Sequence, residues 1–331
     1  MRIAVTGATG FVGRHFAEHA LSASHAISAL NRPASPRKQE LIRDLEARGA
    51  DFHAGDVGDP ASLLPAMRGA DCVCHFASAF RETGVPDDHF RAVNIAGTGN
   101  VVEAAAAQGV RRFVLCSTAG IYGPKVPGVI DESAPVRPAN IYEQSKVEAE
   151  EVVRRQAVAR GMEYAIIRPA VVYGPYDERL VKMFRAASRG RFPLFGKGAG
   201  RRHMVYVGDV ADAALRACVL PAASGEEMII AGPRAAPLSE ILEVLARVAG
   251  RASSGPRLPL APMMALAAVT EDTGKFLGIK PPIYRRRMDF YRNDAEFDCS
   301  RARRVLGWKP AVDLEEGFRR TLESYRESGW I

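Results

Sequence analysis

The 331-residue sequence has few cysteines, no long apolar run and no recognisable export signal. Five cysteines, an odd number spread along the chain, do not make a disulfide framework, so buried reduced thiols are expected. No run of about 18 or more apolar residues is present, so no membrane-spanning helix is predicted. The first residues lead directly into "RIAVTGATG", without the basic region, apolar core and cleavage site of a signal peptide. These absences predict a cytoplasmic globular protein with no membrane partner.

Basic residues are in excess and give a formal net charge of +7. The arginines occur in small scattered groups, and no zinc-finger spacing or aromatic single-strand platform accompanies them, so nucleic-acid binding is not expected. Cys72 and Cys74 share a strand face without a second His/Cys cluster, so no metal site is predicted. A basic surface also suits an anionic small molecule, which it can steer.

Over the first half of the chain, short apolar segments alternate with segments that have helical periodicity. Near-continuous apolar strands separated by helices predict a parallel sheet covered on both faces. We therefore expect an α/β, doubly wound (Rossmann) domain over residues 1–175 and a smaller, interleaved substrate-binding region over 176–331, which returns some elements to the first domain. The expected strands of the first domain are 2–5, 26–30, 50–57, 70–78, 111–118 and 163–175.

The second region is less regular in its pattern. Asp209 and Ser239 are each expected to cap a following helix, because short polar side chains at helix starts accept backbone hydrogen bonds. Residues 251–297, rich in proline, arginine and methionine, are expected to form a lid or helical cap. The sequence pattern over residues 300–327 predicts two helices around a Gly-Trp-Lys-Pro turn.

The segment "TGATGFVG" places Gly7, Gly10 and Gly13 between the first strand and the first helix. Gly7 allows a tight turn, Gly10 lets backbone approach a phosphate, and Gly13 allows close packing of helix on sheet. The expected helix follows over "RHFAEHALSA", and its free N–H groups and positive dipole end favour a pyrophosphate. The segment predicts a dinucleotide site; the alternative is a glycine turn without a ligand.

The end of the second strand bears on which dinucleotide binds. NAD sites usually present an acidic residue there to the ribose hydroxyls. Here the position reads Asn31-Arg32, with no carboxylate to repel a phosphate and a cation that could pair with one. The pattern favours NADP(H) over NAD(H), unless Arg32 is only a loop arginine.

In "YEQSK", Tyr142 and Lys146 are four residues apart, so on a helix they lie on one face. A free tyrosine with a pKa near 10 is a poor base at neutral pH, but a neighbouring ammonium stabilises its phenolate. The pair could be an acid/base device or a surface helix pair, and the glycine loop favours the first.

Taken together, these motifs resemble those of the extended short-chain dehydrogenases/reductases, the NAD-dependent epimerase/dehydratase family. The glycine pattern and the Tyr-x-x-x-Lys pair match, and "ALNRPAS" resembles the hydroxysteroid-dehydrogenase-like and dihydroflavonol-reductase-like members. Five further segments also match the family: "GDV", "HFAS", "VNIAGTGN", "STAGIYG" and "RPAVVYGP". The resemblance implies that the cofactor contacts lie on Gly7, Gly10, Phe11, Val12, Gly13, Asn31, Arg32, Asp56, Val57, Phe76, Ala77, Ser78, Asn94, Ser117, Tyr142, Lys146 and Pro169.

The resemblance also implies a reaction. Tyr142 would be the general acid/base, Lys146 would lower its pKa and hold the nicotinamide ribose, and Thr118 would orient the substrate oxygen. Hydride would pass between NAD(P) and the carbon of a secondary alcohol or ketone. Family members often pair through two helices, here 91–108 and 142–160, so a homodimer is expected.

Departures from the family pattern narrow the reaction. Family dehydratases carry an Asp-Glu pair after the catalytic threonine, where this chain has Ala119 and Gly120, so dehydration is not expected. Nucleotide-sugar enzymes commonly have asparagine where this chain has Val171, whereas Arg202 matches an arginine that contacts the substrate diphosphate in those enzymes. An oxidoreductase is favoured; a nucleotide-sugar 4-epimerase with tightly bound NAD, and a non-catalytic dinucleotide sensor, are the alternatives.

Overall fold

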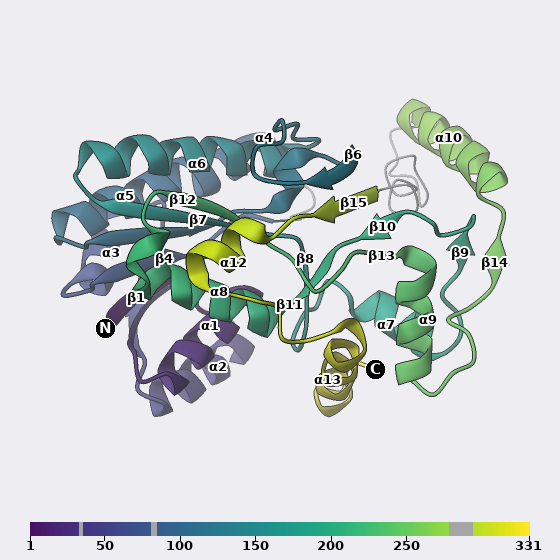
Figure 1. Cartoon of the computed structure of the whole chain (residues 1–331), viewed down its shortest axis with the longest axis horizontal. Helices are drawn as coiled ribbons and strands as arrows, with labels where there is room; N and C mark the ends of the chain where they lie inside the picture. The colour runs from purple at the N-terminus through teal and green to yellow at the C-terminus, as the bar shows by residue number, and fades with distance from the viewer. Residues whose placement is uncertain (33–35, 81–84, 278–293) are drawn as a thin grey trace.

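A seven-stranded parallel sheet forms the centre of the protein (Figure 1). The computed structural model describes residues 1–32, 36–80, 85–277 and 294–331. Strand order in the sheet is β12-β7-β5-β4-β1-β2-β3. Its strands are β1 (Arg2–Thr6), β2 (Ala26–Asn31), β3 (Asp51–Ala54), β4 (Cys72–His75), β5 (Arg112–Cys116), β7 (Glu163–Pro169) and β12 (Glu226–Ile230). The chain builds outward in one direction from β1 to β3 and in the other from β4 to β12, so the order reverses between β1 and β4, where open α/β sheets bind ligands.

Helices cover both faces of this sheet (Figure 1). One face carries α3 (Pro60–Met67), α5 (Gly97–Ala107) and α6 (Ile141–Ala159), and the other carries α1 (Phe11–Ser22), α8 (Val207–Val219) and α12 (Ser300–Leu306). Ile3 and Val5 of β1 join the core beneath α1 and α8, whereas Ala4 joins the core beneath α3 and α5. Alternate residues thus enter opposite cores, which is why the strands are apolar throughout. The prediction of a doubly wound sheet is confirmed.

The remaining elements connect this sheet to a second, less regular region. They are α2 (Pro36–Ala47), α4 (Asp87–Arg91), a π-helical turn (Ala92–Ala96), a 3-10 turn (Ala119–Tyr122), β6 (Lys125–Ile130), β8 (Val171–Tyr173), α7 (Val181–Ser188), β9 (Leu194–Phe195), β10 (Arg201–Arg202), β11 (Met204–Tyr206), a 3-10 turn (Pro221–Ala223), β13 (Ala236–Pro237), α9 (Leu238–Val248), β14 (Arg257–Leu258), α10 (Leu260–Leu277), β15 (Asp294–Phe297) and α13 (Leu314–Glu327). Elements β12, α8 and α12, from the second half of the sequence, pack on the first-half sheet. The boundary at 175/176 itself stays a prediction.

Several local predictions need correction. The strand expected over 163–175 divides after Pro169, and β8 leaves the main sheet to pair with β11. Helix α9 begins at Leu238 after Pro237, so Ser239 is not its cap; its amide donates to the carbonyl of Gly198. Helix α8 begins at Val207, so Asp209 lies within its first turn.

One other prediction for the second region is confirmed. Two helices, α12 and α13, flank the Gly-Trp-Lys-Pro turn as expected. In the segment expected to form a lid or cap, α10 is helical, while residues 278–293 lie outside the described part of the chain. All five cysteines are free thiols. Among the described residues, every helix is too short or too polar to span a bilayer.

Candidate active site

The glycine loop lies at the carboxyl end of β1, where the strand order reverses. Gly7 has a φ of 74°, and the Gly10 amide donates to its carbonyl at 2.9 Å. A Cβ on Gly7 would lie 2.7 Å from the backbone nitrogen of Ala77, and one on Gly13 would overlap the Gly7 carbonyl oxygen. A Cβ on exposed Gly10, by contrast, would touch only this loop's own backbone. The loop is therefore closed toward the protein and open outward, as a backbone cradle for phosphate requires.

Helix α1 begins directly from this loop. Gly10 is its N-cap, and in the described chain neither a capping side chain nor a first-turn acidic residue occupies that end. The amides of the first turn, beginning with Phe11 and Val12, therefore present uncompensated donors and the positive end of the helix dipole. These features fit a dinucleotide pyrophosphate.

The rim at the end of β2 carries both a cation and a carboxylate. The Arg32 side chain is 66% exposed, and its Nε lies 3.8 Å from Oδ2 of Asp56. Asp56 Oδ1 accepts from the Gly58 amide at 2.7 Å, and Asn31 Oδ1 accepts from the Thr9 hydroxyl at 2.6 Å. The rim thus brings Asn31, Arg32 and Asp56 together, with the charge of Arg32 partly offset by Asp56. Val57, beside Asp56, packs against α5 and accepts from the Asn100 amide.

Asn94 ties the end of β4 to the helix that carries Tyr142. It is 1% exposed and lies in the π-helical turn that precedes α5, a deviation often found at functional sites. Its Oδ1 accepts from the Ala79 amide at 2.7 Å and the Ser78 hydroxyl at 3.0 Å. Its Nδ2 donates to the Ala79 carbonyl at 3.1 Å and to Ser145 Oγ at 2.8 Å. Asn94 therefore holds the segment after β4, at Ser78 and Ala79, against Ser145 of α6.

Tyr142 and Lys146 lie at the start of α6, on one face of the helix. Asn140 caps this helix by accepting from the Glu143 amide, and Glu143 accepts from the Ala139 amide. Tyr142 is half-buried, and its ring meets that of Phe80 edge-on with centroids 4.6 Å apart. Lys146 is 2% exposed; burial lowers its pKa, and the negative charge of Glu150 offsets part of this effect.

Ser145 links the backbone of Tyr142 to Asn94, and sequence reasoning missed it. It is fully buried, and its hydroxyl donates to the Tyr142 carbonyl at 2.8 Å while accepting from Asn94. Its position between Tyr142 and Lys146, on the face that α6 buries, could have indicated that Ser145 is part of the site.

The loop after β5 brings Thr118 to the same helix. Thr118 Oγ1 accepts from the Gly120 amide at 3.0 Å. A Cβ on Gly120 would lie 3.2 Å from Thr118 Oγ1 and 3.3 Å from Glu143 Oε1, so this loop rests on the first turn of α6. Ser117, 5% exposed, has a buried hydroxyl with no partner among the described residues, which suits a contact to a bound cofactor. Pro169 closes the neighbouring strand, β7.

The family model described as "NAD dependent epimerase/dehydratase family" matches residues 3–231, more than half of the chain. The chain belongs to this family. It is therefore an enzyme of an NAD-dependent oxidoreductase and epimerase family, and the resemblance drawn from its motifs is confirmed.

Relatives of this family member include both reductases and epimerases. It is 31% identical to the UDP-glucose 4-epimerase of Mycolicibacterium smegmatis over 98% of this chain and 99% of the relative. It is 27% identical to the 2-alkyl-3-oxoalkanoate reductase of Stenotrophomonas maltophilia, again over 98% and 99%. Among solved structures, that of gox2253 superposes with a TM-score of 0.83 and 26% identity, covering 100% of this chain and 99% of the other.

A buried ion network lies one turn beyond Lys146 on α6, and sequence reasoning missed it. Glu150 and Arg168 are 1% and 2% exposed. Arg168 donates to both Glu150 oxygens, at 2.9 and 2.6 Å, to Tyr122 Oη at 2.9 Å, and to Glu227. Arg154 donates to Glu150 at 2.8 Å and to Glu227. Two arginines and two glutamates thus balance in charge and join α6 to β7 and β12.

Arg202 and two histidines, His75 and His203, are buried. Arg202 Nη1 donates to the Arg201 carbonyl at 2.9 Å, and burial lowers its pKa to about 10. His75 lies between the hydroxyls of Thr6 and Thr98, at 2.6 and 3.0 Å, and burial lowers its pKa to about 3. His203 bridges the Gly232 carbonyl and the Phe297 amide. Neighbouring hydroxyl and backbone groups thus hold both histidines in place.

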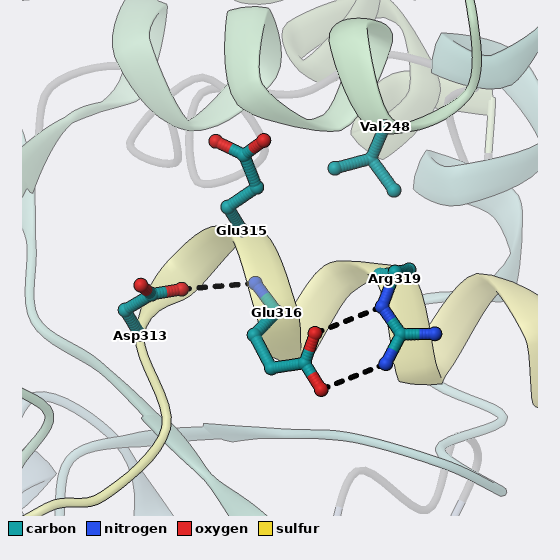
Figure 2. Close-up of a pocket in the computed structure, with 5 residues that line it drawn as sticks. All are labelled: Val248, Asp313, Glu315, Glu316 and Arg319. Atoms are coloured by element: carbon teal, nitrogen blue, oxygen red, sulfur yellow. Dashed lines mark hydrogen bonds and ion pairs between the residues drawn. The ribbon is translucent and has the colours of Figure 1, made fainter.

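A surface hollow of about 350 Å³ lies elsewhere, between α9 and α13 (Figure 2). Its polar side chains are engaged in local contacts: Asp313 caps α13 through the Glu316 amide, Glu316 pairs with Arg319, and Glu315 pairs with Arg247. None of the predicted site residues lines it.

Proposed function

We propose that the protein catalyses NAD(P)-dependent hydride transfer at the carbon of a secondary alcohol or ketone. The observation that carries this proposal is the arrangement around α6: Tyr142 is half-exposed, Lys146 is buried on the same face, and the Thr118 loop rests on the first turn. When bound, the nicotinamide supplies or accepts the hydride. Tyr142 gives its phenolic proton to the carbonyl oxygen in reduction and takes it back in oxidation.

The other residues prepare Tyr142 for this role. Lys146 places a positive charge in a dry environment, where it stabilises the phenolate more strongly than it would in water. Thr118 holds the substrate oxygen, and Asn94 with Ser145 fixes the backbone of the first turn of α6. Ala119 and Gly120 follow Thr118, and Glu143 accepts from the Ala139 amide, which leaves dehydration without a suited acid/base pair.

Reduction is favoured over epimerisation by the surface next to this site. Val171, on β8, is 45% exposed and offers an apolar side chain where a nucleotide-sugar enzyme would hold a diphosphate. The reductase relative acts, by its name, on 2-alkyl-3-oxoalkanoates, which agrees with such a surface. A nucleotide-sugar 4-epimerase remains the second candidate, supported by the 31% identical UDP-glucose 4-epimerase and by Arg202 as a diphosphate ligand.

The proposed preference between NADP(H) and NAD(H) rests on the residues at the end of β2. Arg32 is exposed and could meet a 2′-phosphate, so we propose NADP(H) over NAD(H). Asp56 reduces this advantage, because its carboxylate lies 3.8 Å from Arg32. We propose further that residues 1–175 bind the cofactor, that 176–331 bind the substrate, and that two chains pair through α5 and α6.

Nucleotide released from freshly purified, denatured protein would test the reaction type by absorbance and mass. An empty site, tighter binding of NADPH than NADH, and NADPH oxidation with β-keto acids or other ketones are the expected results. Stoichiometric bound NAD, with conversion of a UDP-sugar in the absence of added nicotinamide, would instead establish the epimerase.

A further inference from the structure

The turn that follows β8 reaches back to the first helix. His15 Nε2 lies 3.0 Å from the Pro175 carbonyl oxygen, and the Arg14 guanidinium lies 3.6 Å from the centroid of the Tyr176 ring. Tyr176 has a φ of 65°, unusual for a side chain of this size, so the turn holds a costly backbone conformation at this point. A segment of the second half of the chain is therefore fixed against the first two turns of α1.

Arg179, at the end of this turn, lies near the rings of Phe11 and Phe80. Its guanidinium carbon is 4.9 Å from the ring centroid of Phe11, the first residue of α1, and 5.5 Å from that of Phe80. Phe80 in turn contacts the ring of Tyr142. A cation is thus placed next to the helix end that offers free amides to a phosphate.

Three hydrogen bonds hold one edge of this guanidinium. Nε donates to Asp177 Oδ1 at 2.6 Å, and Nη2 donates to Asp177 Oδ2 at 2.8 Å and to the Val172 carbonyl at 2.9 Å. Asp177 is fully buried, and Tyr325 of α13 donates to its carbonyl. Within the described residues, Nη1 makes no hydrogen bond to protein, and the side chain is 31% exposed. Arg179 is oriented by Asp177 and retains donors for another group.

We propose that Arg179 binds the pyrophosphate of the dinucleotide cofactor. The first turn of α1 supplies amide donors but no full positive charge, whereas a pyrophosphate carries two negative charges. A guanidinium fixed by its Nε edge loses little freedom when its other edge meets a phosphate oxygen. This inference rests on the proposed cofactor site and adds a residue from the substrate half of the chain to it.

Titration calorimetry with ADP-ribose, which carries the pyrophosphate but no nicotinamide, tests the inference. Arg179→Gln is expected to weaken ADP-ribose binding about tenfold, as loss of one charge-assisted contact does. Arg179→Lys is expected to weaken it at least about threefold, because one amine cannot serve both Asp177 and a phosphate. Arg155→Gln, which removes the same charge from an exposed position on α6, serves as the matched control and should bind as the wild type does.

Three outcomes separate the possibilities. If both Arg179 variants bind ADP-ribose like the wild type, the inference is wrong. If only the KM for the carbonyl or sugar substrate rises, Arg179 binds a substrate anion and the cofactor assignment is overturned. If the wild type itself does not bind ADP-ribose, the proposed cofactor site fails with it. Thermal unfolding verifies that each variant is folded, and Arg179→Lys decides alone should the glutamine variant not fold.

Discussion

Replacing Glu150 with glutamine should destabilise the protein strongly, although the two side chains have nearly the same shape. Glu150 is 1% exposed and accepts two hydrogen bonds from Arg168 and one from Arg154. Removing one partner of a buried ion pair costs about 3–5 kcal/mol, because the remaining charge stays buried without compensation. Glu227 still contacts Arg168 in the variant, so we expect a loss of roughly 2–4 kcal/mol.

Thermal unfolding followed by circular dichroism measures this loss. At about 2–4 °C per kcal/mol, the conversion for domains of about 150–250 residues, the midpoint should fall by roughly 4–16 °C. Glu151→Gln is the matched control, because the Glu151 carboxylate is exposed on the same helix. This variant should shift the midpoint by less than about 1 °C. Equal midpoints for the two variants would refute the view that this network stabilises α6. Glu150→Met combined with Arg168→Met should recover part of the loss, because no orphaned charge then remains at that pair.

Four further predictions address the site and the assembly. Tyr142→Phe should lower the rate of hydride transfer by about 10²- to 10⁴-fold; a smaller effect in stopped-flow absorbance would remove Tyr142 from the proton transfer. Gly13→Ala should weaken ADP-ribose binding more than about tenfold because its Cβ overlaps the backbone of the loop, whereas Gly99→Ala, whose Cβ would have room at 3.4 Å, should bind normally in the same titration. Since burial lowers the pKa of Lys146 below its ordinary value of 10.5, its positive charge is lost as the pH rises through this lowered pKa. The alkaline fall of kcat/KM should therefore begin below pH 10.5, and a profile flat to that pH would contradict a role for this charge. Light scattering should give twice the chain mass of 35.8 kDa, and Val158→Glu, at a position 66% exposed on α6, should return it toward one chain mass; a monomeric wild type would exclude the dimer.

The parallel sheet and the glycine loop could be predicted because both depend on local sequence. A strand buried on both faces must be apolar at successive positions, as Ile3, Ala4 and Val5 are, and this pattern is legible without knowing the partners. The glycines of the loop are required by contacts within a few residues or with the adjacent strand end. Tyr142 and Lys146 could be paired because helical periodicity alone places them on one face.

The errors occurred where a distant segment decides the local structure. Asp209 looks like a cap, but β11 runs directly into α8 and moves the helix start to Val207. Its carboxylate instead accepts from the amides of Ala311 and Val312, about 100 residues later. Helix α9 similarly starts at Leu238, since the preceding residues are used by β13, which pairs with β10. When two-residue strands that are far apart in the sequence pair, they are too short to show a periodic pattern in the sequence.

Along one face of α6, the side chains become more buried from the start of the helix inward, and the acid/base pair depends on this order. Tyr142 lies at the half-exposed end, Ser145 and Lys146 follow at 0% and 2% exposure, and Glu150 is at 1%. The phenol must meet substrate and exchange protons, so it belongs at the open end. The ammonium acts on the phenol by its charge, which is stronger in a dry environment, but burial alone favours the neutral amine. Glu150 offsets that tendency, and Arg168 and Arg154 in turn balance Glu150. Glu150 is the member of the network whose charge raises the pKa of Lys146, so Glu150→Gln should lower both the stability of the protein and the pH at which Lys146 loses its charge.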